Sequence, residues 1–138
     1  MRFICLDIGD KRTGIASGDT ETRLAGPLTV VNANSRAQMV DAIVRTIRAE
    51  NTKQIVIGLP LNMDGSEGPR TAMVRAVADE IHRHLSSCTI HFHDERLSTF
   101  DADQKMARIG LTHGQKKARR DALAATAILQ DFLDLSDS

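Results

Sequence analysis

The spacing of apolar residues changes several times along the chain, and the changes predict strands alternating with helices. Residues 2–9 are almost continuously apolar, which is typical of a strand buried on both faces. Shorter apolar or alternating runs at 13–18, 28–31, 53–59 and 89–93 predict four more strands. A Gly-Pro pair at 26–27 separates the second and third of these five strands.

Apolar residues spaced three and four apart predict the helices. The first covers residues 35–50, with Ser35 as its N-cap. A second starts near Pro69, a residue favoured in the first turn, and its apolar face extends to residue 85. We expect a short helix that stops at Gly110 and a last helix from about 117 to 135.

This order of elements predicts one α/β domain over residues 1–138. The first two strands form an antiparallel hairpin. The later strands alternate with helices, so right-handed crossovers would make them parallel. The expected architecture is a mixed five-stranded sheet with helices on both faces, in three layers.

Charge is balanced overall but not along the chain. The 18 basic and 18 acidic residues cancel, yet residues 105–120 hold six Lys or Arg and no acid, and four Asp with no base follow from 121. Such a basic stretch can meet a polyanion, or it can simply be a solvated loop. Only 3% of residues are aromatic, so stacking of bases on an aromatic platform is not expected.

The start of the chain and its cysteines indicate a cytoplasmic protein with no membrane partner. The chain opens on a predicted strand rather than on a signal peptide, and no apolar run reaches membrane-spanning length. Cys5 and Cys88 each lie in or beside an apolar segment without metal-ligand spacing, so both are expected to be buried thiols.

Three carboxylates occupy positions where burial would be costly. Asp7 interrupts the first apolar strand, Glu95 stands at the end of a predicted parallel strand, and Asp121 lies on the apolar stripe of the last helix. An unpaired buried carboxylate costs several kcal/mol. The structural alternatives are a salt bridge for Asp7, a helix N-terminal charge for Asp121 and a surface pair of Glu95 with Arg96.

A divalent cation would resolve the conflict if the three carboxylates converge. Like charges raise each other's pKa, and an all-oxygen ligand set suits Mg²⁺ or Mn²⁺ rather than Zn²⁺. Two such ions can activate a water molecule and stabilise the leaving oxygen of a phosphodiester. Gly9, just after the strand, would then let a phosphate backbone approach closely.

Four motifs carry a resemblance that runs along nearly the whole chain. They are LDIGDKRTGIA at 6–16, IVIGLPLNMDGSEGPR at 55–70, DERLSTFDA at 94–102 and KKARRDALAATAILQDFL at 116–133. Together they resemble the YqgF/RuvX-type family, whose members have an RNase H-like fold and are described as Holliday junction resolvases or as nucleases maturing the 5′ end of pre-16S ribosomal RNA.

The resemblance implies a site and a reaction. The family's acidic residues map onto Asp7, Glu95 and Asp121, which would be both the catalytic residues and the ligands of two Mg²⁺ or Mn²⁺ ions when substrate is bound. Its chemistry implies a product with a 5′-phosphate. The motif residues and basic side chains that we expect to contact nucleic acid are Gly9, Lys11, Arg12, Asn62, Arg70, Arg96, Lys116, Lys117, Arg119 and Arg120.

Several functions stay open at this point. The favoured hypothesis is a metal-dependent nuclease acting on pre-16S rRNA, with a Holliday junction resolvase on branched DNA as the alternative. A monomer suits RNA trimming, and a homodimer suits two symmetric cuts in a junction. A non-catalytic nucleic-acid-binding factor and an ATPase relative are further alternatives, and the histidines lack a convincing zinc-ligand spacing.

Overall fold

A computed structural model describes residues 1–97 and 113–135, with the side chains of 113–121 outside the description. Strands and helices alternate as the apolar spacing predicts. The elements are β1 (Arg2–Ile8), β2 (Arg12–Asp19), β3 (Leu24–Asn32), α1 (Arg36–Glu50), β4 (Gln54–Leu59), α2 (Pro69–His84), β5 (Thr89–Asp94), the 3₁₀ turn η1 (Glu95–Leu97) and α4 (His113–Leu135).

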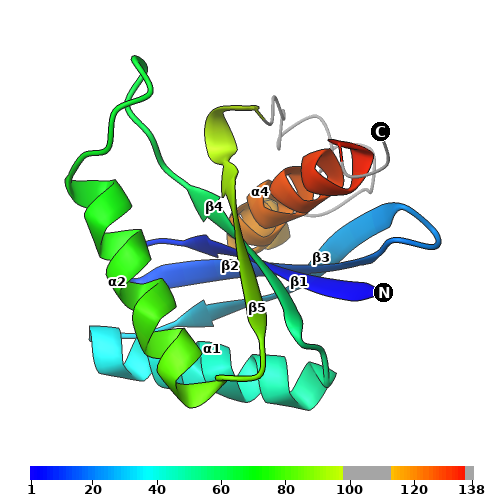
Figure 1. Cartoon of the computed structure of the whole chain (residues 1–138), viewed down its shortest axis with the longest axis horizontal. Coiled ribbons are helices and arrows are strands. Elements are labelled where there is room, and N and C mark those ends of the chain that lie inside the picture. The colour runs from blue at the N-terminus through cyan, green and yellow to red at the C-terminus, as the bar shows by residue number, and fades with distance from the viewer. Residues whose placement is uncertain (98–112, 136–138) are drawn as a thin grey trace.

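The five strands form one mixed sheet in the order β3-β2-β1-β4-β5 (Figure 1). β1 pairs antiparallel with β2, and β2 with β3. β1 pairs parallel with β4, and β4 with β5. The predicted hairpin start and the predicted parallel second half are both confirmed.

The sheet is covered on both faces, which confirms the three-layer prediction. α1 and α2 pack on one face and α4 on the other (Figure 1). Alternation along β1 supplies both cores: Ile4 and Leu6 lie in the cluster with α1 and α2, while Phe3 and Cys5 lie in the cluster with α4. Odd-numbered β1 positions therefore face α4.

The helix starts follow local capping chemistry. The Ser35 side chain accepts a hydrogen bond from the Gln38 amide at 3.2 Å, which confirms the predicted N-cap of α1. α2 begins at Pro69, where the missing amide hydrogen costs nothing. Asn51 ends α1 in the left-handed conformation, with φ of 53°.

Two predicted boundaries are wrong, and one predicted helix is not described. β3 runs over Leu24–Asn32 rather than 28–31, because Pro27 is tolerated on an edge strand that has a partner on one side only. α4 begins at His113, four residues before the expected start. The expected helix ending at Gly110 lies outside the described residues.

Both cysteines are free and buried, as expected. Across residues 1–97 and 113–135, no helix is long and apolar enough to cross a membrane.

The packing of α4 yields a stability prediction. Leu129 is fully buried against the sheet, whereas Leu135, on the same helix, is 54% exposed. Leu129→Ala should lower the free energy of unfolding by about 2–5 kcal/mol, because it leaves a cavity, and Leu135→Ala should change it by less than about 0.5 kcal/mol. Urea titration measures both, and equal midpoints would contradict this packing.

Candidate active site

The candidate residues gather at one edge of the sheet because of strand direction. The parallel strands β1, β4 and β5 all end there, and the antiparallel β2 begins there. Asp7, Glu95 and Arg12 therefore belong to the same edge although they are far apart in sequence. Binding sites in open α/β sheets form at this kind of edge.

Asp7 is the second-to-last residue of β1, and its side chain is partly buried. It is paired with Gly14 of β2. The parallel register with β4 ends at Leu6 and Ile57, so the next residues along, Asp7 and Gly58, lie side by side. As an odd-numbered residue of β1, Asp7 belongs to the face that α4 covers. Gly14 lies opposite it on β2, and Gly58 directly follows the last β4 residue that is paired with β1.

Glu95 fills the space over Gly58. A Cβ atom added to Gly58 would lie 3.5 Å from Glu95 Oε2, 3.7 Å from Glu95 Cβ and 2.8 Å from Ile128 Cδ1. The Glu95 side chain is thus held between β4 and α4, beside the strand position of Asp7. Strand register and this close approach place Glu95 at the same edge of the sheet as Asp7.

The environment of Glu95 disfavours its charge. Burial raises the pKa of this carboxyl group, Arg70 opposes the shift, and the negative charge of Asp94 adds to it. The negative charge of Asp7 also affects a neighbouring thiol. Burial, with a smaller contribution from Asp7, raises the pKa of Cys5 well above its ordinary value. Negative charge therefore collects at this edge, with Arg70 as a nearby counter-charge.

The third predicted carboxylate belongs to the helix that closes this edge. Asp121 is in α4, directly before Ala122, which lines a hollow together with Arg12. The side chain of Asp121 lies outside the described residues, as do those of Lys116, Lys117, Arg119 and Arg120. Among the described side chains, no group of three His, Cys, Asp or Glu could hold a metal ion.

The donors that are described fit a hard cation. Asp7 and Glu95 offer carboxylate oxygens, which Mg²⁺ and Mn²⁺ prefer, and no described histidine or cysteine joins them. Burial raises the pKa of Glu95, so its ionised form is disfavoured in the folded protein. Such a group would gain from a bound cation.

Arg96 has partners inside the protein. Its guanidinium donates to both carboxylate oxygens of Asp94, at 2.7–3.1 Å. The Nη1 atom also donates to the carbonyl oxygens of Asn62 at 3.2 Å and Met63 at 3.1 Å. The alternative of a surface pair between Glu95 and Arg96 is not what these bonds show, because Arg96 pairs with Asp94 and ties η1 to the loop after β4.

Other predicted nucleic-acid contacts also have local structural roles. The Gly9 amide donates to the Arg12 carbonyl at 2.9 Å, and a Cβ atom on Gly9 would lie only 2.7 Å from that oxygen. The exposed Lys11 accepts a bond from the Ala33 amide through its carbonyl. Asn62 donates from Nδ2 to Ser66 Oγ at 2.9 Å. Gly9 is therefore required by the turn itself.

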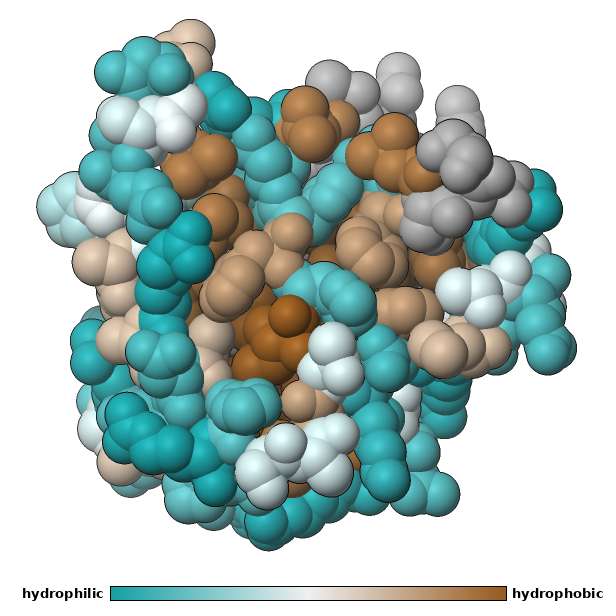
Figure 2. Space-filling view, in the orientation of Figure 1, coloured by the Kyte–Doolittle hydropathy of each residue, from teal (hydrophilic) through white to brown (hydrophobic). Residues whose placement is uncertain are grey.

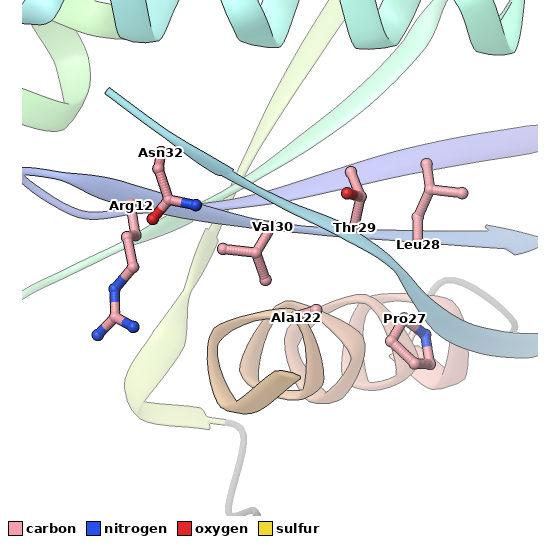
Figure 3. Close-up of a pocket in the computed structure, with 7 residues that line it drawn as sticks. All are labelled: Arg12, Pro27, Leu28, Thr29, Val30, Asn32 and Ala122. Carbon is pink, nitrogen blue, oxygen red and sulfur yellow. The ribbon is translucent and has the colours of Figure 1, made fainter. Parts of the chain in front are cut away.

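Arg12 lies at one end of a hollow between the sheet and α4. The hollow measures about 450 Å³, and Val30 and Pro27 face the helix across it (Figure 3). Asn32 and Arg12 are paired in the β2–β3 register, so both polar side chains belong to the edge where β1 ends. Arg12 therefore adds a positive charge at this edge of the sheet, on the β2 side of Asp7.

Three residues near the site were not predicted. Asp94 orients Arg96, and an acid and a base two residues apart at a strand end could have indicated this pair. His93, which is 8% exposed, lies with Nε2 2.6 Å from Asp131 Oδ2 on α4. These partners are 38 residues apart, so no local pattern could reveal that the last strand and the last helix are joined there.

The whole chain matches one protein family. A model of the RuvX family, described as Holliday junction resolvase, matches residues 1–135. A protein of Chloroflexus aurantiacus named "Putative pre-16S rRNA nuclease" is 39% identical over 132 residues, covering 96% of this chain and 86% of that protein. A protein of the same name from Anaeromyxobacter sp. (strain Fw109-5) is 41% identical over 134 residues and 97% of each chain.

Solved structures share the fold at low sequence identity. RuvC of T. thermophilus in complex with a Holliday junction substrate superposes with a TM-score of 0.63 at 11% identity, covering 99% of this chain and 96% of that one. The Fowlpox virus resolvase, solved with Holliday junction DNA, gives a TM-score of 0.57 at 10% identity, covering 96% and 99%. The expected RNase H-like fold is confirmed.

The turn at Gly9 yields a prediction about stability. Gly9→Ala should lower the free energy of unfolding by more than about 1 kcal/mol, because the added Cβ displaces the Arg12 carbonyl. Gly26→Ala is the matched control, since nothing lies within 4 Å of a Cβ at that position. It should be neutral or slightly stabilising. Equal losses in thermal unfolding would show that the turn is not the constraint.

The burial of Glu95 predicts how the free energy of unfolding depends on pH when a chelator keeps metal ions away. Its raised pKa means that the protonated folded form is favoured, and that this stability is lost as pH rises through the folded pKa. Relative to the parent, Glu95→Gln should therefore gain unfolding free energy as pH increases from about 4 to 8.

Asp94→Asn should show the opposite sign. The hydrogen bond from Arg96 lowers the pKa of Asp94, so its contribution is present at neutral pH and is lost as pH falls through the folded pKa. Urea titrations from about pH 2 to 8 compare each variant with the parent, because the contribution of Asp94 is lost below about pH 4. Parallel profiles for both variants would contradict the assigned environments.

Proposed function

Since the chain belongs to the RuvX family, we propose that it is a metal-dependent nuclease that hydrolyses phosphodiester bonds in structured nucleic acid, in the 5′-end maturation of pre-16S rRNA. One observation carries the proposal. The half-buried Glu95 side chain lies over Gly58, at the sheet edge where the strand of Asp7 ends, and burial raises its pKa. A purely structural edge of the sheet gains nothing from that arrangement.

We assign the metal-holding role to Asp7, Glu95 and Asp121. Their carboxylate oxygens suit Mg²⁺ or Mn²⁺, two of which would be held when substrate is present. When bound, such ions supply an activated water and stabilise the charge that develops on the leaving oxygen. Water adds to the phosphorus atom, the bond to the 3′-oxygen breaks, and the product carries a 5′-phosphate.

The positive residues around the carboxylates would hold the substrate. Arg70 is close enough to Glu95 to oppose its pKa shift, so it is placed to balance the charge of a phosphate at the same edge. Arg12 and Lys11 lie where β2 begins, on the other side of Asp7. Contacts of this kind act on the backbone of the nucleic acid and carry no sequence information.

The choice of substrate rests on the relatives. The name of the curated proteins that are 39–41% identical to this chain supports pre-16S rRNA, a substrate that would place the protein in the cytoplasm. Branched DNA is the second candidate, favoured by the description of the family model and by the junction complexes of RuvC and the Fowlpox virus resolvase. A junction cut twice would require a homodimer, and RNA trimming is possible for a monomer.

The cleavage rate of the Asp7→Asn variant tests the proposed metal site. The variant should lose at least about a hundredfold in cleavage rate with Mg²⁺ or Mn²⁺, because several kcal/mol of transition-state stabilisation depend on the metal site. Asp10→Asn makes the same chemical change at an exposed position three residues away and should cleave like the parent.

The assay uses a 5′-extended 16S rRNA fragment and a four-way DNA junction side by side. Faster cleavage of the RNA supports the maturation role, and faster cleavage of the junction supports resolution. Equal rates for Asp7→Asn and the parent would reject this site. Salt-dependent binding without turnover of either substrate would instead favour a non-catalytic binding factor.

A further inference from the structure

The loop between β4 and α2, residues 60–68, projects from the body of the protein beside the candidate site (Figure 1), and the same projection is visible in the space-filling view (Figure 2). It carries Met63, which is 98% exposed and has the largest exposed fraction of the large apolar residues described as exposed. We infer that Met63 is an apolar wedge that enters the base stack of the substrate at a branch or a helix end. This inference rests on the proposed nucleic-acid substrate.

The loop has a fixed conformation, although it is exposed. The Asn62 amide donates to the Ser66 carbonyl, and the Gly65 amide donates to the Asn62 carbonyl, each at 2.9 Å. Gly65 adopts φ of +88°, which suits glycine. The Asp64 carboxylate accepts from both the amide and the hydroxyl of Ser66. These bonds close a tight turn around Met63.

The base of the loop is anchored as well. The buried hydroxyl of Thr71, the third residue of α2, donates to the Pro60 carbonyl and accepts from the Gly68 amide. Together, these contacts fix the two ends of the loop against each other. An ordered loop loses little conformational entropy when a ligand binds, so its tip can be used as a rigid probe.

Arg96 joins the loop tip to the site. Its Nη1 donates to the carbonyl oxygens of Asn62 and Met63, while Nε and Nη2 hold Asp94. Glu95, enclosed over Gly58, is the residue between Asp94 and Arg96. The backbone of Met63 and the carboxylate that we assign to metal binding are therefore held by one short segment of chain.

Of the two acidic residues of the loop, Glu67 is balanced by a cation, whereas Asp64 remains an exposed negative charge. Glu67 accepts two bonds from Arg75, at 2.7 and 3.0 Å, and this contact lowers its pKa. Asp64 is turned into the loop by its bonds from Ser66, which lower its pKa, with a smaller contribution from Arg96. The Met63 side chain is what projects at the tip.

The chemistry of methionine suits insertion between bases. An unbranched, polarizable side chain adapts to the flat faces of bases and makes favourable contacts with aromatic rings. Apolar side chains, Met among them, enter base steps in proteins that bend nucleic acid, and unstacking is least costly where pairing is already interrupted. A branch point or a duplex end near the scissile bond is such a place.

Fluorescence of 2-aminopurine, which rises when the base is unstacked, tests the inference in the absence of cleavage. The probe is placed at the branch of a four-way DNA junction and, separately, at the duplex end of an RNA hairpin, both in chelator. The parent should raise the fluorescence of at least one substrate. Met63→Ala should lose most of that rise, and Met63→Phe should retain it.

Leu24→Ala is the matched control, because Leu24 is 69% exposed on β3. It should behave like the parent, and equal thermal unfolding of all variants would exclude a folding defect. With Mg²⁺ or Mn²⁺, Met63→Ala should cleave the responsive substrate about tenfold more slowly, or about 1.4 kcal/mol, but cleave a single strand of the same sequence at the parental rate.

The outcomes separate this inference from the proposed function. An unchanged fluorescence rise in Met63→Ala, or no rise with the parent on either substrate, overturns the wedge. A rise that depends on Met63 without cleavage by the parent supports the wedge and rejects the nuclease. The responsive substrate also distinguishes the two sources of such a base step, junction DNA and precursor RNA.

Discussion

The candidate site depends on one electrostatic constraint, the half-buried position of the Glu95 carboxylate over Gly58 of β4. The missing side chain of Gly58 creates the space, and Ile128 closes it from the helix. Burial there raises the pKa of Glu95 more than Arg70 can offset. Burial of a carboxylate in this position lowers stability at neutral pH, a cost that the proposed metal-binding role would explain.

Sheet topology turns this local constraint into a site. With the order β3-β2-β1-β4-β5, the strand that carries Asp7 is central, and glycines of both neighbouring strands lie beside that residue. The next parallel strand leads into Glu95, and the antiparallel β2 begins with Arg12. The residues that we propose as metal ligands and as cations binding the nucleic-acid backbone therefore come from different strands but belong to one edge of the sheet.

Much of the fold could be predicted from sequence because the burial of one or both faces of an element gives its apolar residues a regular spacing. The strands, α1, α2 and the covered faces of the sheet follow from apolar spacing, and Asp7 and Glu95 stand out because they interrupt that spacing. The full length of β3 could not be predicted, since only the sheet order shows that Pro27 is on an edge. The partners of Arg96 and His93 depend on contacts across more than 30 residues, which no local pattern encodes. The convergence of Asp121 with the other two carboxylates stays a prediction.

The Cys5 thiol is fully buried, two residues before Asp7 on the same face of β1. Its burial has a practical consequence for chemical labelling. Its raised pKa keeps the reactive thiolate scarce at neutral pH, and burial also raises the pKa of Cys88. Electrophiles and mild oxidants should therefore spare both native sulfurs. A single cysteine introduced on the surface could then carry a fluorophore or spin label selectively, without first removing the two thiols that the core encloses.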